Sequence, residues 1–160
     1  MTVRIGQGFD LHPYDPDPGR ALVLGGVRIE GERGLAGHSD ADVCAHACAD
    51  ALLGAAGLGD LGSHFPDDDP AWRGADSIDL LGQTAALVRG AGFEPGNVDC
   101  TIVCDRPKLA PYRSRMEARL SEAVGAPVTV AAKRTEGVGS LGRGEAVVCW
   151  AVALVVGGEG

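Results

Sequence analysis

The segment that most constrains the fold is residues 146–156, in which all eleven side chains are apolar. This run is too short to cross a membrane as a helix, and its β-branched side chains predict a strand. A strand without polar positions has no face for solvent, so we expect it to be buried on both faces, within the subunit or between subunits. The chain is therefore expected to be built around a β-sheet.

Other segments show strand and helix patterns in turn. Alternating apolar side chains predict a strand over residues 2–12, and an apolar run at 21–29 is expected to pair with it. Ser39, with Asp42 three residues later, indicates a helix start, and this Ala-rich helix is expected to reach Ala56. Two further helices and two further strands are predicted, over residues 77–91, 111–124, 98–104 and 128–133.

Residues 57–75 carry so many glycines, prolines and aspartates that we expect one long loop there. The chain has 160 residues, enough for one core, and no repeat or linker interrupts it. We therefore predict one domain over residues 1–160 of the α/β (α+β) class, a single-layer mixed β-sheet with helices packed on one face.

Charge and cysteine content narrow the class of protein. A net charge of −8 argues against nucleic-acid and membrane-surface partners, which select for clustered Lys and Arg. No segment has the length of a membrane span and residues 1–9 do not look like a signal peptide, so we expect a cytoplasmic protein. Five cysteines without metal-site spacing are expected to be small buried side chains: Cys44, Cys48, Cys100, Cys104 and Cys149.

Asp10 and His12 are candidate metal ligands. They stand two residues apart near the end of a predicted strand, so both side chains leave the same face. His46, on the helix after His38 and Ser39, could complete an Asp-His-His set, the chemistry of many zinc sites. The simpler interpretation is that an acidic residue such as Asp42 stabilises the helix N-terminus, while a histidine on an Ala-rich face is packed.

Three other polar segments could bind a ligand. The loop with Asp60, Gly62, Phe65, Asp67 and Asp69 could bind a sugar or a metal-bridged diphosphate, or it could be a solvated acidic loop. Residues 104–111 could hold a base or phosphate with Lys108, or be an ordinary connection.

Residues 133–136 come at a predicted strand end. Lys133, Arg134, Thr135 and Glu136 combine cations, a hydroxyl and a carboxylate, as contact with a metal-bound polyphosphate requires. A surface ion pair is the alternative interpretation. Arg143, in a Gly-rich loop, could place its guanidinium on a phosphate.

Taken in order, these motifs resemble the 2-C-methyl-D-erythritol 2,4-cyclodiphosphate synthase family over nearly the whole chain. The resemblance rests on residues 6–12, 38–62, 65–67, 96–99, 107–109 and 141–145. It implies an enzyme, a phosphorus-oxygen lyase of non-mevalonate isoprenoid biosynthesis. In that reaction the 2-phosphate of 4-diphosphocytidyl-2-C-methyl-D-erythritol 2-phosphate attacks the β-phosphate, releases CMP and forms the 2,4-cyclodiphosphate.

The resemblance also implies the parts of the site. Asp10, His12 and His46 would bind Zn²⁺, and Glu136 would bind a second divalent cation, Mg²⁺ or Mn²⁺. His38, Arg134 and Thr135 would act in catalysis. The implied substrate contacts are Asp10, His12, His38, Ser39, Asp60, Gly62, Phe65, Asp67, Asp69, Cys104, Pro107, Lys108, Leu109, Ala110, Lys133, Thr135, Glu136 and Arg143.

Relatives of this kind are homotrimers, with active sites between subunits and sheets facing the threefold axis. The chain departs from the family at two positions. Arg134 stands where a threonine is usual, with Thr135 one residue later, and Ser140 stands where many relatives carry an aromatic residue. Two other functions remain open on the sequence: a zinc-dependent phosphohydrolase, and a non-catalytic trimer that binds diphosphates or isoprenoids.

Overall fold

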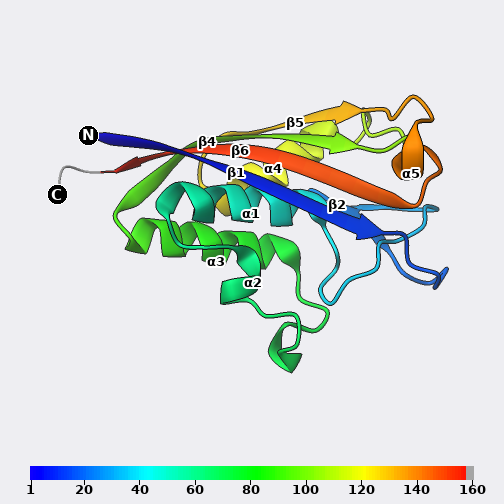
Figure 1. Ribbon diagram of the computed structural model, residues 1–160, viewed down its shortest axis with the longest axis horizontal. Coiled ribbons are helices and arrows are strands. Elements are labelled where there is room, and N and C mark those ends of the chain that lie inside the picture. The colour runs from blue at the N-terminus through cyan, green and yellow to red at the C-terminus, as the bar shows by residue number, and fades with distance from the viewer. Residues whose placement is uncertain (158–160) are drawn as a thin grey trace.

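A four-stranded mixed sheet forms the centre of the computed structural model, which describes residues 1–157 (Figure 1). Its strand order is β1 (Thr2–Pro13), β6 (Ala146–Gly157), β4 (Phe93–Val103) and β5 (Val128–Lys133). The central strand β6 runs antiparallel to both β1 and β4, whereas β4 and β5 are parallel. The prediction of a mixed α/β fold is confirmed.

Three long helices cover one face of this sheet, as Figure 1 shows: α1 (Val43–Ala56), α3 (Ser77–Gly90) and α4 (Arg113–Val124). Almost every residue of α1 is buried between the sheet and α3. Gly57 and Gly125 end α1 and α4 in the left-handed conformation, which glycine adopts without steric cost. The predicted packing of helices on one face is confirmed.

Helix α1 lies very close to β1 because two glycines of the strand face it. A Cβ at Gly8 would lie 1.9 Å from the Ala47 carbonyl oxygen, and one at Gly6 would lie 2.1 Å from that of Ala51. Small side chains on both elements thus allow the two backbones to touch. This contact brings His46 of α1 next to the last residues of β1.

The predicted pairing of residues 2–12 with 21–29 is wrong. Strand β1 pairs with β6, while β2 (Leu22–Leu24) and β3 (Val27–Ile29) form a separate hairpin. Gly25 and Gly26 both have positive φ, 57° and 71°, so they form the two-residue turn that joins strands of this twist. The apolar run at 21–29 is therefore two short strands, and its two glycines are the turn between them.

The predicted start of α1 at Ser39 is also wrong. Asp42 is the N-cap, because its side chain accepts hydrogen bonds from the backbone N–H groups of Cys44 and Ala45. Ala41 has φ 59°, which a right-handed helix cannot include.

Residues 57–75 are more regular than predicted. They contain the single-turn helix α2 (Leu61–His64) and the 3₁₀ turn η1 (Pro70–Trp72), each capped by an aspartate. A further short helix, α5 (Gly139–Gly142), lies in the Gly-rich connection. Strand β4 begins at Phe93, five residues before the predicted boundary, and α4 begins at Arg113, two residues after it.

Strand β6 is buried on one face along its length, but from Trp150 onward its other face is exposed or half-buried. Trp150 and Val152 are 41% and 49% exposed, and with Ile5 and Phe9 of β1 they form an apolar strip on the helix-free face. Phe9 and Trp150 meet edge to face, with ring centroids 5.0 Å apart. The expected burial on both faces therefore does not hold within one chain. The expectation for the five cysteines is confirmed, since all are buried free thiols.

Within residues 1–157, no helix combines the length and the apolar character needed to cross a lipid bilayer.

Candidate metal centre and neighbouring pockets

Three potential metal ligands converge at the end of β1. The Oδ2 atom of Asp10 lies 3.0 Å from His12 Nε2 and 3.0 Å from His46 Nδ1. The two imidazole nitrogens are 3.4 Å apart. In the part of the chain that the structure describes, this is the one group of three or more His, Cys, Asp and Glu side chains that could share an ion. The predicted ligands Asp10, His12 and His46 are therefore together.

Both imidazoles are held with the correct nitrogen facing the group. His12 Nδ1 lies 2.7 Å from the Ala36 carbonyl oxygen, which can only accept, so Nδ1 carries the proton and a neutral ring presents a lone pair at Nε2. His46 Nε2 lies 2.8 Å from Ser77 Oγ, which leaves Nδ1 toward Asp10. Three lone pairs then point at one another, an arrangement that a cation stabilises.

Hydrogen bonds and charges within the group shift the pKa values of Asp10 and His12. Burial raises the pKa of Asp10, but the hydrogen bonds and charges of His12 and His46 outweigh burial and leave that pKa well below its usual value. Burial lowers the pKa of His12, yet the hydrogen bond to Asp10 and its negative charge outweigh burial and leave the pKa raised above 6.5. The carboxylate therefore stays ionised, and a positive charge, from protons or a metal, is favoured beside it.

A pocket of about 390 Å³ surrounds the three ligands. Predicted contacts from three segments line it: His38 and Ser39 before α1, Gly62 of α2, and Phe65 and Asp67 beyond it. Phe65 meets Trp72 edge to face at 5.0 Å, forming an aromatic wall. The structure therefore gathers most of the predicted sugar and phosphate contacts at the metal ligands.

Asp60 and Asp69 do not line this pocket. Asp60 is exposed and caps α2 by accepting from Ser63 N at 2.9 Å, and Asp69 caps η1 by accepting from Ala71 N at 2.9 Å. The Asp69 backbone oxygen accepts from His38 Nε2 at 3.1 Å. Both aspartates thus shape the loop that borders the pocket.

Sequence reasoning missed several residues of this pocket. Asp50 lines it one helical turn after His46, and its carboxylate accepts from Leu61 N at 2.7 Å, which ties α2 to α1. Ser77 contacts His46 from the first turn of α3. The spacing of Asp50 from His46 was a usable signal, whereas nothing local to Ser77 marks it as different from any helix start.

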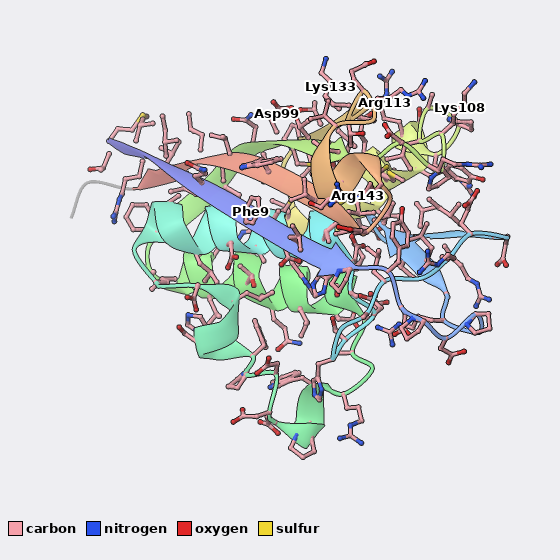
Figure 2. The ribbon with its side chains drawn as sticks, turned by 45° about the vertical axis from the view of Figure 1, so that its right-hand side comes forward. Phe9, Asp99, Lys108, Arg113, Lys133 and Arg143 are labelled. Carbon is pink, nitrogen blue, oxygen red and sulfur yellow. The ribbon has the colours of Figure 1, made fainter. Side chains whose placement is uncertain are left out.

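A second pocket, of about 520 Å³, lies between the loop after β4 and the end of β5. Its lining includes these predicted nucleotide and phosphate contacts: Cys104, Pro107, Lys108, Leu109, Ala110, Lys133 and Arg134. Lys108 and Lys133 project into solvent at the end of the molecule that also carries Arg143 (Figure 2). This pocket and the metal pocket have no lining residue in common.

The remaining predicted residues lie around the second pocket. Thr135 donates its hydroxyl hydrogen bond to Asp105, and the same carboxylate accepts from Thr135 N at 2.8 Å. Arg134 is 74% exposed and lies 3.9 Å from Asp105. Glu136 is exposed, with φ 56°, and is not grouped with the other metal ligands.

Arg143 lines an adjoining pocket of about 530 Å³ and pairs with Glu145 at 3.2 Å. Ser140, which replaces a usual aromatic residue, is exposed in α5.

Fold and site together define an α/β protein with a pocket whose Asp-His-His group could hold a metal ion, and a separate, cation-bordered loop pocket. The model of the YgbB family matches residues 3–156. A "2-C-methyl-D-erythritol 2,4-cyclodiphosphate synthase" of Symbiobacterium thermophilum is 51% identical over 156 residues, covering 96% of this chain and 98% of the relative. The chain belongs to the YgbB family, the family of 2-C-methyl-D-erythritol 2,4-cyclodiphosphate synthases.

Longer relatives contain the same unit. A "Bifunctional enzyme IspD/IspF" of Anaeromyxobacter sp. is 55% identical over 157 residues, covering 96% of this chain, and this chain spans only 40% of that relative. Among solved structures, "IspF (Plasmodium falciparum) CDP complex" superimposes with a TM-score of 0.83 at 30% identity, covering 98% of this chain and 97% of that one. That relative was therefore solved with CDP.

Proposed function

We propose that this chain converts 4-diphosphocytidyl-2-C-methyl-D-erythritol 2-phosphate into 2-C-methyl-D-erythritol 2,4-cyclodiphosphate and CMP. The observation that carries the proposal is the convergence of Asp10, His12 and His46, with both imidazoles held as ligands, inside a pocket bordered by His38 and Ser39. Family membership supplies the reaction class. We further propose that residues 1–160 form one catalytic domain, of which residues 158–160 lie outside the described part.

The ligand set fits zinc. One carboxylate oxygen and two imidazole nitrogens form the three-ligand arrangement of catalytic zinc sites, in which a fourth position is left for substrate. Bound there, zinc would act as a Lewis acid on a substrate phosphate oxygen. Glu136 would hold Mg²⁺ or Mn²⁺ together with the diphosphate, since Mg²⁺ needs only one or two protein carboxylates when phosphates complete its shell.

The reaction needs no dedicated protein base. A phosphate monoester with a second pKa near 6 is largely dianionic at neutral pH, so the 2-phosphate is already a nucleophile. The task of the protein is to place that phosphate in line with the β-phosphorus, which is worth several orders of magnitude in rate. His38 and Ser39 border the metal pocket and would orient the 2-phosphate, while Gly62 and Phe65 would confine the erythritol.

The loop pocket would hold the cytidine diphosphate portion. Lys108 and Lys133 are exposed cations at its edge, and neither has a carboxylate within 4.0 Å among the described ion pairs, so both can meet phosphate. The "CDP complex" relative supports this ligand chemistry. Arg134 would stabilise charge on the transferring phosphate. Thr135 would join it by turning its hydroxyl proton from Asp105, to which it donates in this structure, toward a phosphate oxygen.

We propose a homotrimer in which the metal pocket of one subunit faces the loop pocket of the next. The apolar strip of Ile5, Phe9, Trp150 and Val152 on the helix-free face supports burial against other copies, because a strip of this kind is costly in water. Two pockets without a common lining residue are the halves that such an interface would join.

Phosphorus NMR of the purified protein with zinc, magnesium and the diphosphocytidyl substrate tests the function. We expect CMP and the cyclic diphosphate to appear together, in equal amounts. Release of inorganic phosphate instead would identify a zinc-dependent phosphohydrolase. Tight nucleotide binding with no product would identify the non-catalytic trimer, and either result would overturn the proposal.

A further inference from the structure

We infer that Asp40, acting through Ser77, is a positioning residue that fixes His46 as a metal ligand. The inference rests on the metal-binding role proposed above for Asp10, His12 and His46. Neither Asp40 nor Ser77 would touch the metal or the substrate in this account. They act on the far side of the His46 ring.

The contacts form a line from a carboxylate to the ring. Ser77 Oγ makes a short hydrogen bond with Asp40 Oδ1 and lies 2.8 Å from His46 Nε2. Asp40 Oδ2 also accepts from the Ser77 backbone N–H at 3.1 Å, so the carboxylate makes two hydrogen bonds to this residue. Ser77 is 1% exposed and His46 9% exposed, which leaves little room for water to take the place of the hydroxyl.

Hydrogen-bond chemistry gives this line a direction. An ionised carboxylate only accepts, so the Ser77 hydroxyl must donate to Asp40, and its oxygen is then free to accept from His46 Nε2–H. That proton placement leaves the lone pair on Nδ1, the nitrogen 3.0 Å from Asp10. Without Asp40 the hydroxyl could turn and donate to Nε2. The ring proton would then sit on Nδ1, where it blocks the metal.

The local backbone aims Asp40 at Ser77. Ala41 adopts φ 59°, a conformation that alanine rarely takes, and this turn separates Asp40 from the α1 cap Asp42. The Asp40 backbone N–H donates to the Ala75 carbonyl oxygen at 3.1 Å. The start of α3 is thereby joined to the segment before α1, and the line to His46 spans both.

The two histidine ligands therefore differ in what holds them. His12 relies on a backbone carbonyl, that of Ala36, which no substitution removes. His46 relies on side chains that can be changed singly: Ser77, 2.8 Å from Nε2 with Asp40 behind it, and Ser39, whose hydroxyl oxygen lies 3.2 Å from the same nitrogen. Outer contacts of this kind contribute about 10- to 100-fold to metal affinity in other zinc sites.

Zinc affinity, measured by competition with a chelator in the absence of substrate, tests the inference. We expect Ser77→Ala to weaken zinc binding by about 10- to 100-fold, and Ser77→Thr, which keeps the hydroxyl, to restore most of that loss. Asp40→Asn should weaken binding by no more than Ser77→Ala. Adding it to Ser77→Ala should cause no further loss, because Asp40 acts through that hydroxyl.

Thr84→Ala is the matched control, since Thr84 is another fully buried hydroxyl residue of α3 and its Oγ1 has no hydrogen-bond partner in residues 1–157. We expect this variant to lose stability but keep its zinc affinity.

Two results would overturn the inference. Equal zinc affinity in the unaltered chain and in Ser77→Ala would show that Asp40 and Ser77 do not position His46, and would not contradict the metal site itself. No zinc binding by the unaltered chain would overturn both the metal site and the positioning role of Asp40 and Ser77. Neither result depends on cyclase activity, so failure of this inference can be distinguished from failure of the proposed reaction.

Discussion

The metal pocket and the loop pocket differ in how much of their geometry one chain provides. Asp10, His12 and His46 have side chains only 23%, 20% and 11% exposed, and each is held by a partner within the same chain. At the loop pocket Arg134 is 74% exposed, and Lys108 extends into solvent at the edge. The side chains of the metal pocket are therefore in place before a ligand binds, whereas those of the loop pocket are exposed to solvent.

This difference follows from the elements that build each pocket. The metal ligands stand on β1 and α1, which are in backbone contact, whereas the loop pocket lies between the connections that follow β4 and β5. A site on packed elements is preorganised, while loop groups are ordered by ligand or by another subunit. We therefore expect changes in the metal pocket to abolish binding of the ion, and changes in the loop pocket to weaken substrate binding.

The largest expected effect comes from removing a ligand. His46→Ala should lose zinc and lower kcat/KM by more than about 1,000-fold, beyond the 10- to 100-fold that outer contacts contribute. Zinc content of the purified protein and the initial rate measure this. His64→Ala is the control, since His64 bonds to the Leu58 carbonyl oxygen and lies outside the metal pocket. Full activity in the His46 variant would contradict the metal assignment.

Gly8→Ala should test whether the contact of β1 with α1 builds the metal pocket. Its Cβ would lie 1.9 Å from a backbone oxygen that cannot turn away, so we expect a loss of about 3 kcal/mol in the free energy of unfolding, with weaker zinc binding. Urea denaturation with and without zinc measures both.

Gly90→Ala is the control for this prediction. Nothing lies within 4 Å of its Cβ, at the end of a helix, and alanine there should stabilise by up to about 1 kcal/mol. A Gly8 variant as stable as the unaltered chain would show that α1 is not seated on β1 in this way.

Lys108→Ala should raise KM about tenfold and leave zinc content unchanged, because a hydrogen bond to a charged group is worth about 1.5–3 kcal/mol. Steady-state kinetics with parallel zinc analysis separates the two pockets. Arg28→Ala, which removes an exposed cation paired with Glu30 on the β2–β3 hairpin, should change neither quantity. Zinc loss in the Lys108 variant would mean that the pockets are not independent in this respect.

Lowering the pH should stabilise the zinc-free protein and weaken the stabilisation that zinc provides. Because the pKa of His12 is raised above 6.5, its contribution to the stability of the metal-free protein is full below pH 6.5 and is lost as pH rises through the raised pKa. Zinc competes with that proton, so apparent zinc affinity should fall by up to about tenfold per pH unit below the raised pKa.

Melting temperatures from pH 5.5 to 8.5 test this prediction. Zinc should stabilise more as pH rises, while the chelator-treated protein becomes less stable. The His12→Ala variant should show neither trend as strongly. Parallel pH curves for the two forms of the unaltered chain would contradict the assignment of His12.

The sequence predicted the fold well where periodicity is strong and less well where long-range pairing decides. Residues 128–133 form β5 with the predicted bounds, because a short apolar run between Pro127 and a charged end has few alternatives. The partner of β1 was predicted wrongly, since pairing across the whole chain leaves no local signal.

The spacing in the sequence revealed the candidate metal ligands, but it did not reveal the residues that hold those ligands in place. Two residues in a strand share a face whatever the fold, so Asp10 and His12 were visible in the sequence. The contact of Ser77 with His46 joins two helix starts 31 residues apart, and only the packing of α3 against α1 creates it. The N-cap Asp42 was missed because the left-handed turn at Ala41 is not encoded by a glycine.

The most direct test of the account is a mixing experiment between two inactive variants. His46→Ala removes the metal pocket, and Ala110→Trp fills the loop pocket beside Lys108 while leaving the metal ligands intact. If one active site takes its metal half and its loop half from different chains, subunits unfolded and refolded together should recover about a quarter of the wild-type activity. No recovery, from mixed oligomers shown to have formed, would contradict a site shared between subunits.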